Sequence, residues 1–120
     1  VQATDPEVFR SARADINPVY TDLIESVARV ITENVEFIGQ VKVVGHTDSI
    51  PVQASNPFQS NQGLSEARAR TIADMLTAAG VPASLVTHEG RAATEPIADN
   101  GTREGRARNR RVEIVLQKQV

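Results

Sequence analysis

The segment Q-V-K-V-V-G-H-T-D (residues 40–48) joins a run of β-branched residues to a glycine and then to three polar residues. Its first part has the composition of a strand, and Gly45 ends that strand. Asp48 opens a stretch rich in Pro, Ser, Asn and Gln that continues to about Gln62. Loops longer than about 12 residues in a compact domain usually carry function or are disordered. The segment therefore predicts a strand whose carboxyl end leads into a functional loop.

Two segments on either side of this strand have the spacing of amphipathic helices. The first is residues 19–31, which follows the start signal Asn17-Pro18. Its predicted apolar stripe comprises Val19, Leu23, Val27, Val30 and Ile31. The second is residues 65–79, with Ser65 as the predicted N-cap and Gly80 as the C-terminal stop. Its predicted stripe comprises Ala69, Ile72, Met75, Leu76 and Ala79.

Three further segments are predicted as strands: residues 7–11, 84–90 and 110–117. The last alternates, which predicts Val112, Ile114 and Leu116 on one face and Arg111, Glu113 and Gln117 on the other. A short helical turn is predicted near residues 104–107. The order β, α, β, α, β, β favours one mixed sheet with helices on one face. The carboxyl ends of strands in such sheets commonly bind ligands.

The bulk composition narrows the class of protein. A chain of 120 residues, 40% hydrophobic and 23% charged, fits one globular domain. The net charge of −2 favours neither nucleic acid nor an anionic membrane surface as a partner. The absence of cysteine excludes disulfides and thiolate metal sites. No run reaches the roughly 18 apolar residues that span a bilayer.

Metal binding and hydrolysis are both weakly supported. The candidate ligands His46, Asp48, His88 and Glu89 form no ligand-spacing motif. Neither Ser49 nor Ser65 lies in a G-x-S-x-G turn. Asp48 with Glu66 or Glu89 could act as a carboxylate pair, but a chain with 15 acidic residues always offers such pairs. We therefore expect no metal and no catalytic residue.

The arginine-rich stretch T-R-E-G-R-A-R-N-R-R (102–111) suggests nucleic acid at first sight. Nucleic-acid binders usually combine such a stretch with exposed aromatic residues or a strongly basic domain, whereas this chain is acidic overall and has one tyrosine and three phenylalanines. A solvated basic turn, or capture of a small carboxylate, remains open.

A charged pocket is the interpretation in which these residues converge. Asp48 follows the strand, Arg68 lies in the first turn of the next predicted helix, and Arg110 begins the last strand. The carboxylate could hold an ammonium, while arginine and the free N–H groups of the helix start could hold a carboxylate. A zwitterionic ligand would satisfy both. An ion pair between Asp48 and Arg68 explains the same residues equally well.

Four collinear segments resemble the OmpA-like peptidoglycan-binding family. They are V-V-G-H-T-D (43–48), N-Q-G-L-S-E-A-R-A (61–69), G-R-A-A-T-E-P (90–96) and R-A-R-N-R-R-V-E-I (106–114). The resemblance covers nearly the whole chain from about Val8. It implies an α+β fold, a two-layer βαβαββ sandwich with a mixed four-stranded sheet and helices on one face. It also implies a single domain over residues 1–120 with its core at about 8–117.

The resemblance implies noncatalytic, cofactor-free binding of the peptidoglycan stem peptide, through diaminopimelate, in the Gram-negative periplasm. Asp48 and Arg68 would hold the ammonium and the carboxylate of diaminopimelate. The other site residues that the family motifs imply are Thr47, Asn61, Leu64, Ser65, Asn109 and Arg110.

The proline-bearing stretch between Asp48 and Asn61 is longer than in many family members. It resembles the branch found in MotB-type flagellar stator proteins and in the type VI secretion protein TssL, the latter slightly more. That branch implies a membrane tether upstream of Val1, and subunits of a secretion or motor complex as partners. Gln62 and Gly63 stand where these relatives usually carry an aromatic and an acidic residue. We expect this difference to alter the shape of the pocket.

Two alternatives belong to other functional classes. A dimerisation or assembly module would use an exposed apolar patch instead of the polar pocket. An envelope hydrolase would use Asp48 and a histidine. We also expect the long loop, residues 49–62, to gate the pocket.

Overall fold

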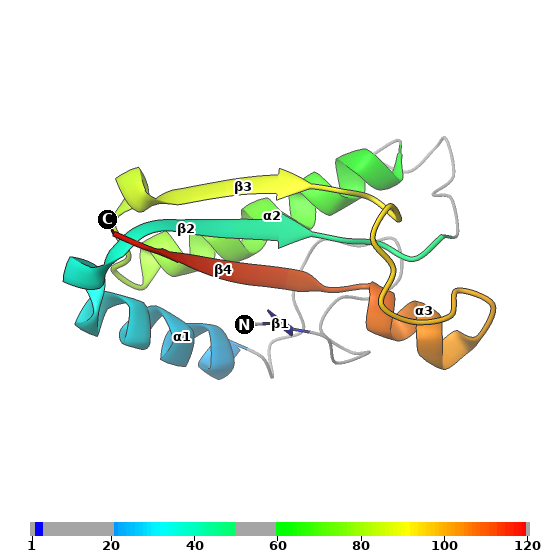
Figure 1. The fold of residues 1–120 in the computed structure, drawn as a ribbon, viewed down its shortest axis with the longest axis horizontal. Helices are drawn as coiled ribbons and strands as arrows, with labels where there is room; N and C mark the ends of the chain where they lie inside the picture. Colours follow the sequence, from blue (N-terminus) through cyan, green and yellow to red (C-terminus); the bar gives the residue numbers. More distant parts are fainter. Residues whose placement is uncertain (1, 4–20, 50–59, 120) are drawn as a thin grey trace.

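A four-stranded sheet with the strand order β1-β4-β2-β3 organises the molecule (Figure 1). The computed structural model describes residues 2–3, 21–49 and 60–119. The strands are β1 (Gln2–Ala3), β2 (Ile38–Gly45), β3 (Val86–Gly90) and β4 (Val112–Lys118). The helices are α1 (Thr21–Glu33), α2 (Asn61–Ala78) and α3 (Arg103–Asn109), with 3₁₀ turns η2 (Val35–Phe37) and η3 (Ala83–Leu85).

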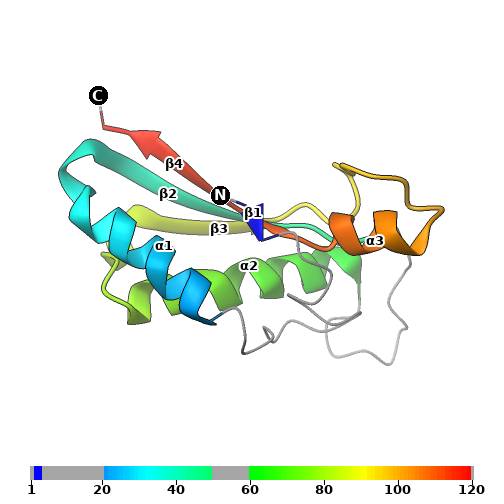
Figure 2. The same ribbon diagram turned by 90° about the horizontal axis from the view of Figure 1, so that it is seen from below.

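The sheet is mixed, because β2 runs parallel to β3 and antiparallel to β4. β1 adds a two-residue antiparallel pairing on the outer edge of β4. Figure 2 shows α1 and α2 together on one side of the sheet. The predicted α+β fold, a mixed four-stranded sheet with helices on one face, is confirmed.

The core lies between the sheet and these two helices. Val41 and Val43 of β2 face the same layer as Val112 and Ile114 of β4, in keeping with the alternation of strand side chains. The helices contribute Ile24, Val27, Ala28, Ile31, Ala69, Ile72, Ala73 and Leu76. Burying a side chain of this size stabilises the fold by roughly 1.5–3 kcal/mol. Aliphatic packing therefore fixes β2, and with it the position of the polar residues that follow.

The apolar stripe of α1 differs from the prediction. Leu23 and Val30 are 43% and 54% exposed, and Ile24 and Ala28 are buried in their place. A helix turns roughly 100° per residue, so Leu23 and Val30 lie about a quarter turn from the buried stripe. Because α1 is apolar over much of its circumference, spacing alone did not decide which part faces the sheet. Val19 lies outside the described residues.

The second helix begins four residues earlier than predicted, at Asn61. Ser60 is its N-cap, and the Ser60 hydroxyl oxygen accepts a hydrogen bond from the Gly63 N–H. Ser65, the predicted cap, is buried inside the helix. The predicted stop is confirmed, because Gly80 has a φ of +110°, which favours glycine. Ala79, predicted in the apolar stripe, is exposed.

The remaining predictions have mixed outcomes. The strand at 7–11 lies outside the described residues, and β1 at Gln2–Ala3 is too short to be predicted. The turn at 104–107 is the middle of α3. In β4 the alternation is confirmed for Val112 and Ile114, whereas Leu116 is partly exposed near the strand end. In the part of the chain that the structure describes, no helix is long and apolar enough to cross a membrane.

Candidate functional site

The carboxyl ends of β2 and β3 meet the first turns of α2, and α3 lies at the same end of the sheet (Figure 1). Gly45 and Gly90 are cross-strand neighbours at these ends. A Cβ added to Gly45 would collide with the Ser65 carbonyl, and one added to Gly90 would collide with the Ser65 hydroxyl oxygen. The two glycines therefore allow α2 to approach the strand ends closely. Sequence analysis assigned Gly45 only to the end of a strand.

Asp48 is buried at this end and forms an ion pair with Arg110. The Arg110 Nη1 lies 2.8 Å from the Asp48 Oδ2. The backbone carbonyl of Asp48 accepts hydrogen bonds from the Thr47 hydroxyl at 2.9 Å and from the Asn61 Nδ2 at 3.4 Å. Asp48 thus contacts three other predicted site residues, Thr47, Asn61 and Arg110, although Arg110 is 62 positions from Asp48 in the chain.

Arg68 is fully buried behind this ion pair. Its Nη1 donates a hydrogen bond to the His46 carbonyl at 3.3 Å. The pKa of Arg68 is lowered from its ordinary value to about 10, mainly by burial and also by the positive charge of Arg110, while the Asp48 carboxylate raises it. Arg68 nevertheless remains a cation at neutral pH, so the site holds one carboxylate and two guanidinium groups.

Ser65 and Ala92 connect α2 to the loop that follows β3. The Ser65 hydroxyl donates to the Gln62 carbonyl at 2.9 Å and accepts from the Ala92 N–H at 3.0 Å. The Ala92 carbonyl accepts from the Thr47 N–H at 2.9 Å. Ala92 has a φ of 49°, the left-handed region that alanine rarely adopts. A strained backbone residue, which sequence analysis missed, therefore joins Thr47 to α2.

Asn109 is buried and uses its whole side-chain amide within the protein. Its Oδ1 accepts from the backbone N–H groups of Ile97 and Ala98 at 2.8 and 3.0 Å. Its Nδ2 donates to the Ala98 carbonyl at 3.0 Å and to the Asn100 Oδ1 at 2.7 Å. Asn109 therefore clamps the loop before α3 and has no hydrogen-bonding capacity left for a ligand.

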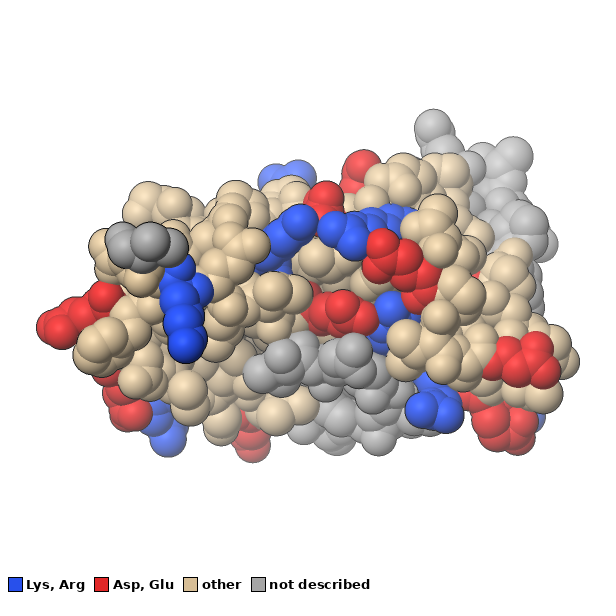
Figure 3. Space-filling view, viewed as in Figure 1, with Lys and Arg blue, Asp and Glu red and all other residues tan. Residues whose placement is uncertain are grey.

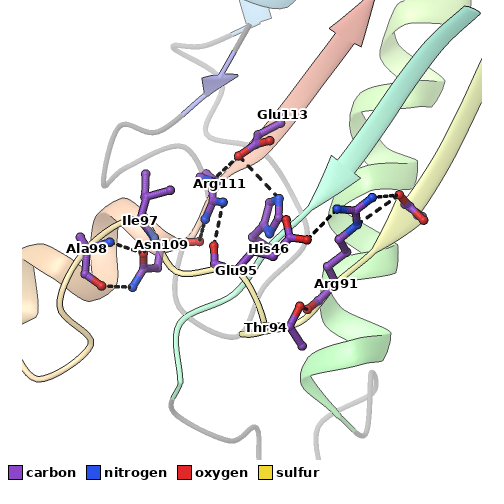
Figure 4. A network of polar contacts seen from close by, with 10 residues as sticks. His46, Arg91, Thr94, Glu95, Ile97, Ala98, Asn109, Arg111 and Glu113 are labelled. Atoms are coloured by element: carbon purple, nitrogen blue, oxygen red, sulfur yellow. Dashed lines mark hydrogen bonds and ion pairs between the residues drawn. The ribbon is translucent and has the colours of Figure 1, made fainter.

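Arg111 is buried, although it was predicted on the face of the last strand opposite Val112 and Ile114. Its Nε donates to the Glu113 Oε1 at 2.8 Å, and its Nη2 to the Glu95 carbonyl at 2.9 Å. Figure 4 shows this guanidinium between Glu113, Glu95 and the ring of His46. The loop after β3 covers it, and strand alternation cannot report a loop that returns over the sheet.

The sheet face opposite the helices carries alternating charges (Figure 3). Glu89 pairs with the Lys42 Nζ at 2.9 Å and with the Arg91 Nη2 at 2.7 Å, and Arg91 pairs with Glu95 at 2.7 Å. The Lys42 and Arg91 contacts lower the pKa of the Glu89 carboxyl. Glu89 is therefore engaged with cations.

Among the described residues, no three His, Asp or Glu side chains lie together as metal ligands would.

Gln62 joins the helix start to the end of β3, because its Nε2 donates to the Gly90 carbonyl at 2.7 Å and to the Glu66 Oε1 at 2.9 Å. Leu64 is buried in the same turn of the helix. Residues 50–59, which make up most of the predicted gating loop, lie outside the described residues.

A model of the OmpA family matches residues 8–110. The chain belongs to the OmpA family. It is 38% identical, over 108 residues, to the probable lipoprotein YiaD of Escherichia coli, covering 90% of this chain and 46% of YiaD. It is 34% identical, over 111 residues, to the peptidoglycan-binding protein ArfA of Mycobacterium tuberculosis, covering 92% of this chain and 32% of ArfA. This OmpA-family chain spans less than half of the length of either relative.

Solved structures of similar fold include the cell wall anchor of the type VI secretion system from Pseudomonas aeruginosa. That structure is 42% identical, with a TM-score of 0.80 and coverage of 94% of this chain and 76% of the other. The periplasmic domain of Helicobacter pylori MotB is 28% identical, with a TM-score of 0.88 and coverage of 99% and 75%. The resemblance to OmpA-like domains of the MotB and TssL type is confirmed.

Proposed function

We propose that this OmpA-family domain binds peptidoglycan noncovalently and without catalysis, by holding the diaminopimelate of the stem peptide. The observation that carries the proposal is the group formed by Asp48, Arg68 and Arg110 at the carboxyl end of β2. One buried carboxylate beside two guanidinium groups complements a ligand that carries both an ammonium and a carboxylate. A relative named as peptidoglycan-binding and a structure of a cell wall anchor support binding to the cell wall.

Each charged group takes one part of the ligand. Asp48 accepts hydrogen bonds from the ammonium, and Arg110 turns partly from Asp48 toward the carboxylate. The Nε of Arg110 is buried and has no hydrogen-bond partner among the described residues, which leaves a donor for this purpose. Arg68 holds the carboxylate end from within the domain and keeps a positive charge beneath the pocket. The ligand thus replaces, in part, an ion pair that the free domain makes internally.

The other proposed residues shape the pocket. Thr47 and Asn61 fix the backbone carbonyl of Asp48, and Leu64 and Ser65 form the wall at the start of α2. Asn109, whose amide bonds are all internal, acts by holding the loop before α3. Binding through so few charged contacts suggests micromolar to millimolar affinity, about −8 to −4 kcal/mol. Several copies in one complex would raise retention on the wall without new contacts.

We further propose that the domain tethers an envelope-spanning machine, a type VI secretion system or a flagellar stator, to the wall. The 42% identity to the secretion-system anchor, against 28% to MotB, favours the former. The domain would then lie in the periplasm of a Gram-negative cell, joined to an upstream membrane anchor and to subunits of the complex.

Cosedimentation with purified sacculi tests the site. Asp48→Asn removes the carboxylate charge, and Arg68→Lys replaces the planar guanidinium by an ammonium. Neither changes the side-chain volume greatly. Each should therefore remove most of the bound fraction. Asp74→Asn and Arg70→Lys are matched controls: this pair lies on the same helix, both side chains are over 70% exposed, and their N–O distance is 3.9 Å. The controls should bind as wild type does. Equal binding by all five proteins, or by none, would contradict the proposal.

Two additions separate the competing functions. A soluble stem peptide that contains diaminopimelate should displace the domain from sacculi, whereas the same peptide with lysine in its place, whose side chain ends in an ammonium without a carboxylate, should not. An assembly module would instead retain its oligomeric state in the Asp48 variant and never bind sacculi. A hydrolase would release fragments from sacculi on long incubation, and we expect none.

A further inference from the structure

His46 carries a buried imidazole next to the proposed pocket, and neither ring nitrogen has a hydrogen-bond partner among the described residues. Only 1% of the residue is exposed. A neutral imidazole offers one donor and one acceptor, and leaving buried polar atoms unpaired costs roughly 1–3 kcal/mol. Unpaired buried groups are rare enough to call for an explanation.

The backbone of His46 supports the pocket on both sides. Its N–H donates to the Arg111 carbonyl at 2.8 Å, and its carbonyl accepts from the Arg68 Nη1 at 3.3 Å. Thr47 and Asp48 follow directly in the chain. A displacement of the His46 ring would therefore move the backbone carbonyl that Arg68 contacts and change the position of Asp48.

Charged groups face the ring from two elements. Arg111 and Glu113 come from β4, and Arg91 and Glu95 come from the loop after β3 (Figure 4). The Glu113 Oε1 lies 3.7 Å from the His46 Nε2, but only 2.8 Å from the Arg111 Nε. The Glu113 carboxylate is thus already engaged by a buried cation.

This arrangement opposes a charge on the ring. Burial is the main reason that the pKa of His46 is lowered, and the adjacent Arg111 guanidinium lowers it further. Glu113 and Glu95 raise it by a smaller amount. At neutral pH the ring is neutral, and the pocket is held together by the backbone contacts of His46.

We propose that His46 is a positioning residue of the pocket whose neutral ring is required for binding, so that acidification releases the domain from the wall. This inference rests on the proposed function. In acid the ring takes up one proton from solvent, and the buried imidazolium is then repelled by the positive charge of the Arg111 guanidinium. It competes with Arg111 for Glu113 or moves toward water. Either movement shifts the His46 carbonyl away from Arg68.

Affinity for sacculi measured between pH 7.5 and pH 4.5 tests this inference in the wild type and in His46→Gln. Glutamine keeps a neutral polar side chain of similar length at every pH. Wild-type affinity should be steady near pH 7.5 and then fall, approaching tenfold per pH unit once the ring is protonated. Over the same pH range, the logarithm of the affinity of His46→Gln should change by less than about half of the wild-type change. Any pH dependence that does not come from His46 is common to both proteins and remains in both profiles.

Glu113→Gln is an independent second variant. Removing the carboxylate that favours a protonated ring should move the wild-type fall in affinity to lower pH. This result would support the inference even if His46→Gln failed to fold. Superimposed pH profiles for wild type and His46→Gln, or an unshifted profile for Glu113→Gln, would overturn it. If the wild type does not bind sacculi at pH 7.5, the proposed function is overturned. If the wild type binds with the same affinity at every pH, only this inference is overturned.

Discussion

Arg110 and Arg111 are neighbours in the chain, yet their side chains lie in two different regions. Arg111 is 2% exposed and contacts Glu113 and the backbone carbonyls of Glu95 and Asn109 beneath the loop after β3. Arg110 is 16% exposed and forms an ion pair with Asp48. Its Nε has no hydrogen-bond partner among the described residues.

The difference separates a scaffold from a binding site. A guanidinium whose donors are used inside the protein fixes the loop around it, and its loss leaves other buried groups unpaired. A guanidinium with a donor to spare can turn toward a ligand. Asn109 belongs with Arg111 by this criterion, although its place in the N-R-R motif suggested a binding role. Substitutions in the scaffold should therefore reduce stability, and substitutions in the site should reduce binding.

Gly45→Ala should give the largest effect, because it removes the support that both regions share. The new Cβ would collide with the backbone carbonyl of Ser65, which cannot move without the helix. We expect a loss of more than about 4 kcal/mol in the free energy of unfolding. Urea unfolding followed by circular dichroism measures it. Gly80→Ala is the control, since its Cβ would meet the Thr32 methyl at an ordinary van der Waals distance of 3.9 Å and only its positive φ adds strain. A Gly45 variant as stable as the control would contradict the close approach of α2.

Arg111→Ala tests the scaffold. The substitution leaves the Glu95 carbonyl and the Glu113 carboxylate without this partner, and we expect a loss of about 3 kcal/mol in stability. The same unfolding measurement applies, with Arg108→Ala, an exposed arginine of α3, as control. A change in stability below about 1 kcal/mol would show that Arg111 is not needed to stabilise the fold and would remove the contrast with Arg110.

Arg110→Lys tests the site from the other direction. Lysine keeps the charge near Asp48 but loses the planar fork, so stability should change by no more than about 1 kcal/mol. Affinity for sacculi should fall by roughly tenfold, the value of one charge-assisted hydrogen bond. Cosedimentation and thermal unfolding on the same samples separate the two quantities. An affinity equal to that of wild type would place Arg110 with the scaffold.

The pH dependence of stability gives the smallest effect. The pKa of His46 is lower in the folded protein than in the unfolded chain. As pH falls below about 6.5 the unfolded chain therefore binds a proton that the folded protein resists, and stability decreases. His46→Gln should remove this contribution, so its unfolding free energy should depend less on pH between 7.5 and 5. Parallel curves for the two proteins would show that the ring is not strained against protonation.

The local elements could be predicted because they depend on short-range patterns. Residues 40–45 have the β-branched composition of a strand, and α2 ends just before Gly80, whose positive φ favours glycine. The order of helices and strands then gave the mixed sheet, and four collinear motifs gave the family. Asp48 and Arg110 were named as site residues from the sequence, and their ion pair follows from the fold.

What the sequence by itself determined about this protein is therefore its elements, their order and the type of residue at the strand ends. Only the tertiary structure decided that Arg111 is buried and Arg110 is not, that α1 turns Leu23 outward, and that Ala92 joins Thr47 to Ser65. The physical reason is that periodicity describes each element alone. Burial and hydrogen bonding depend on which other segment covers a side chain, and the loop after β3 covers Arg111 from 16 residues away.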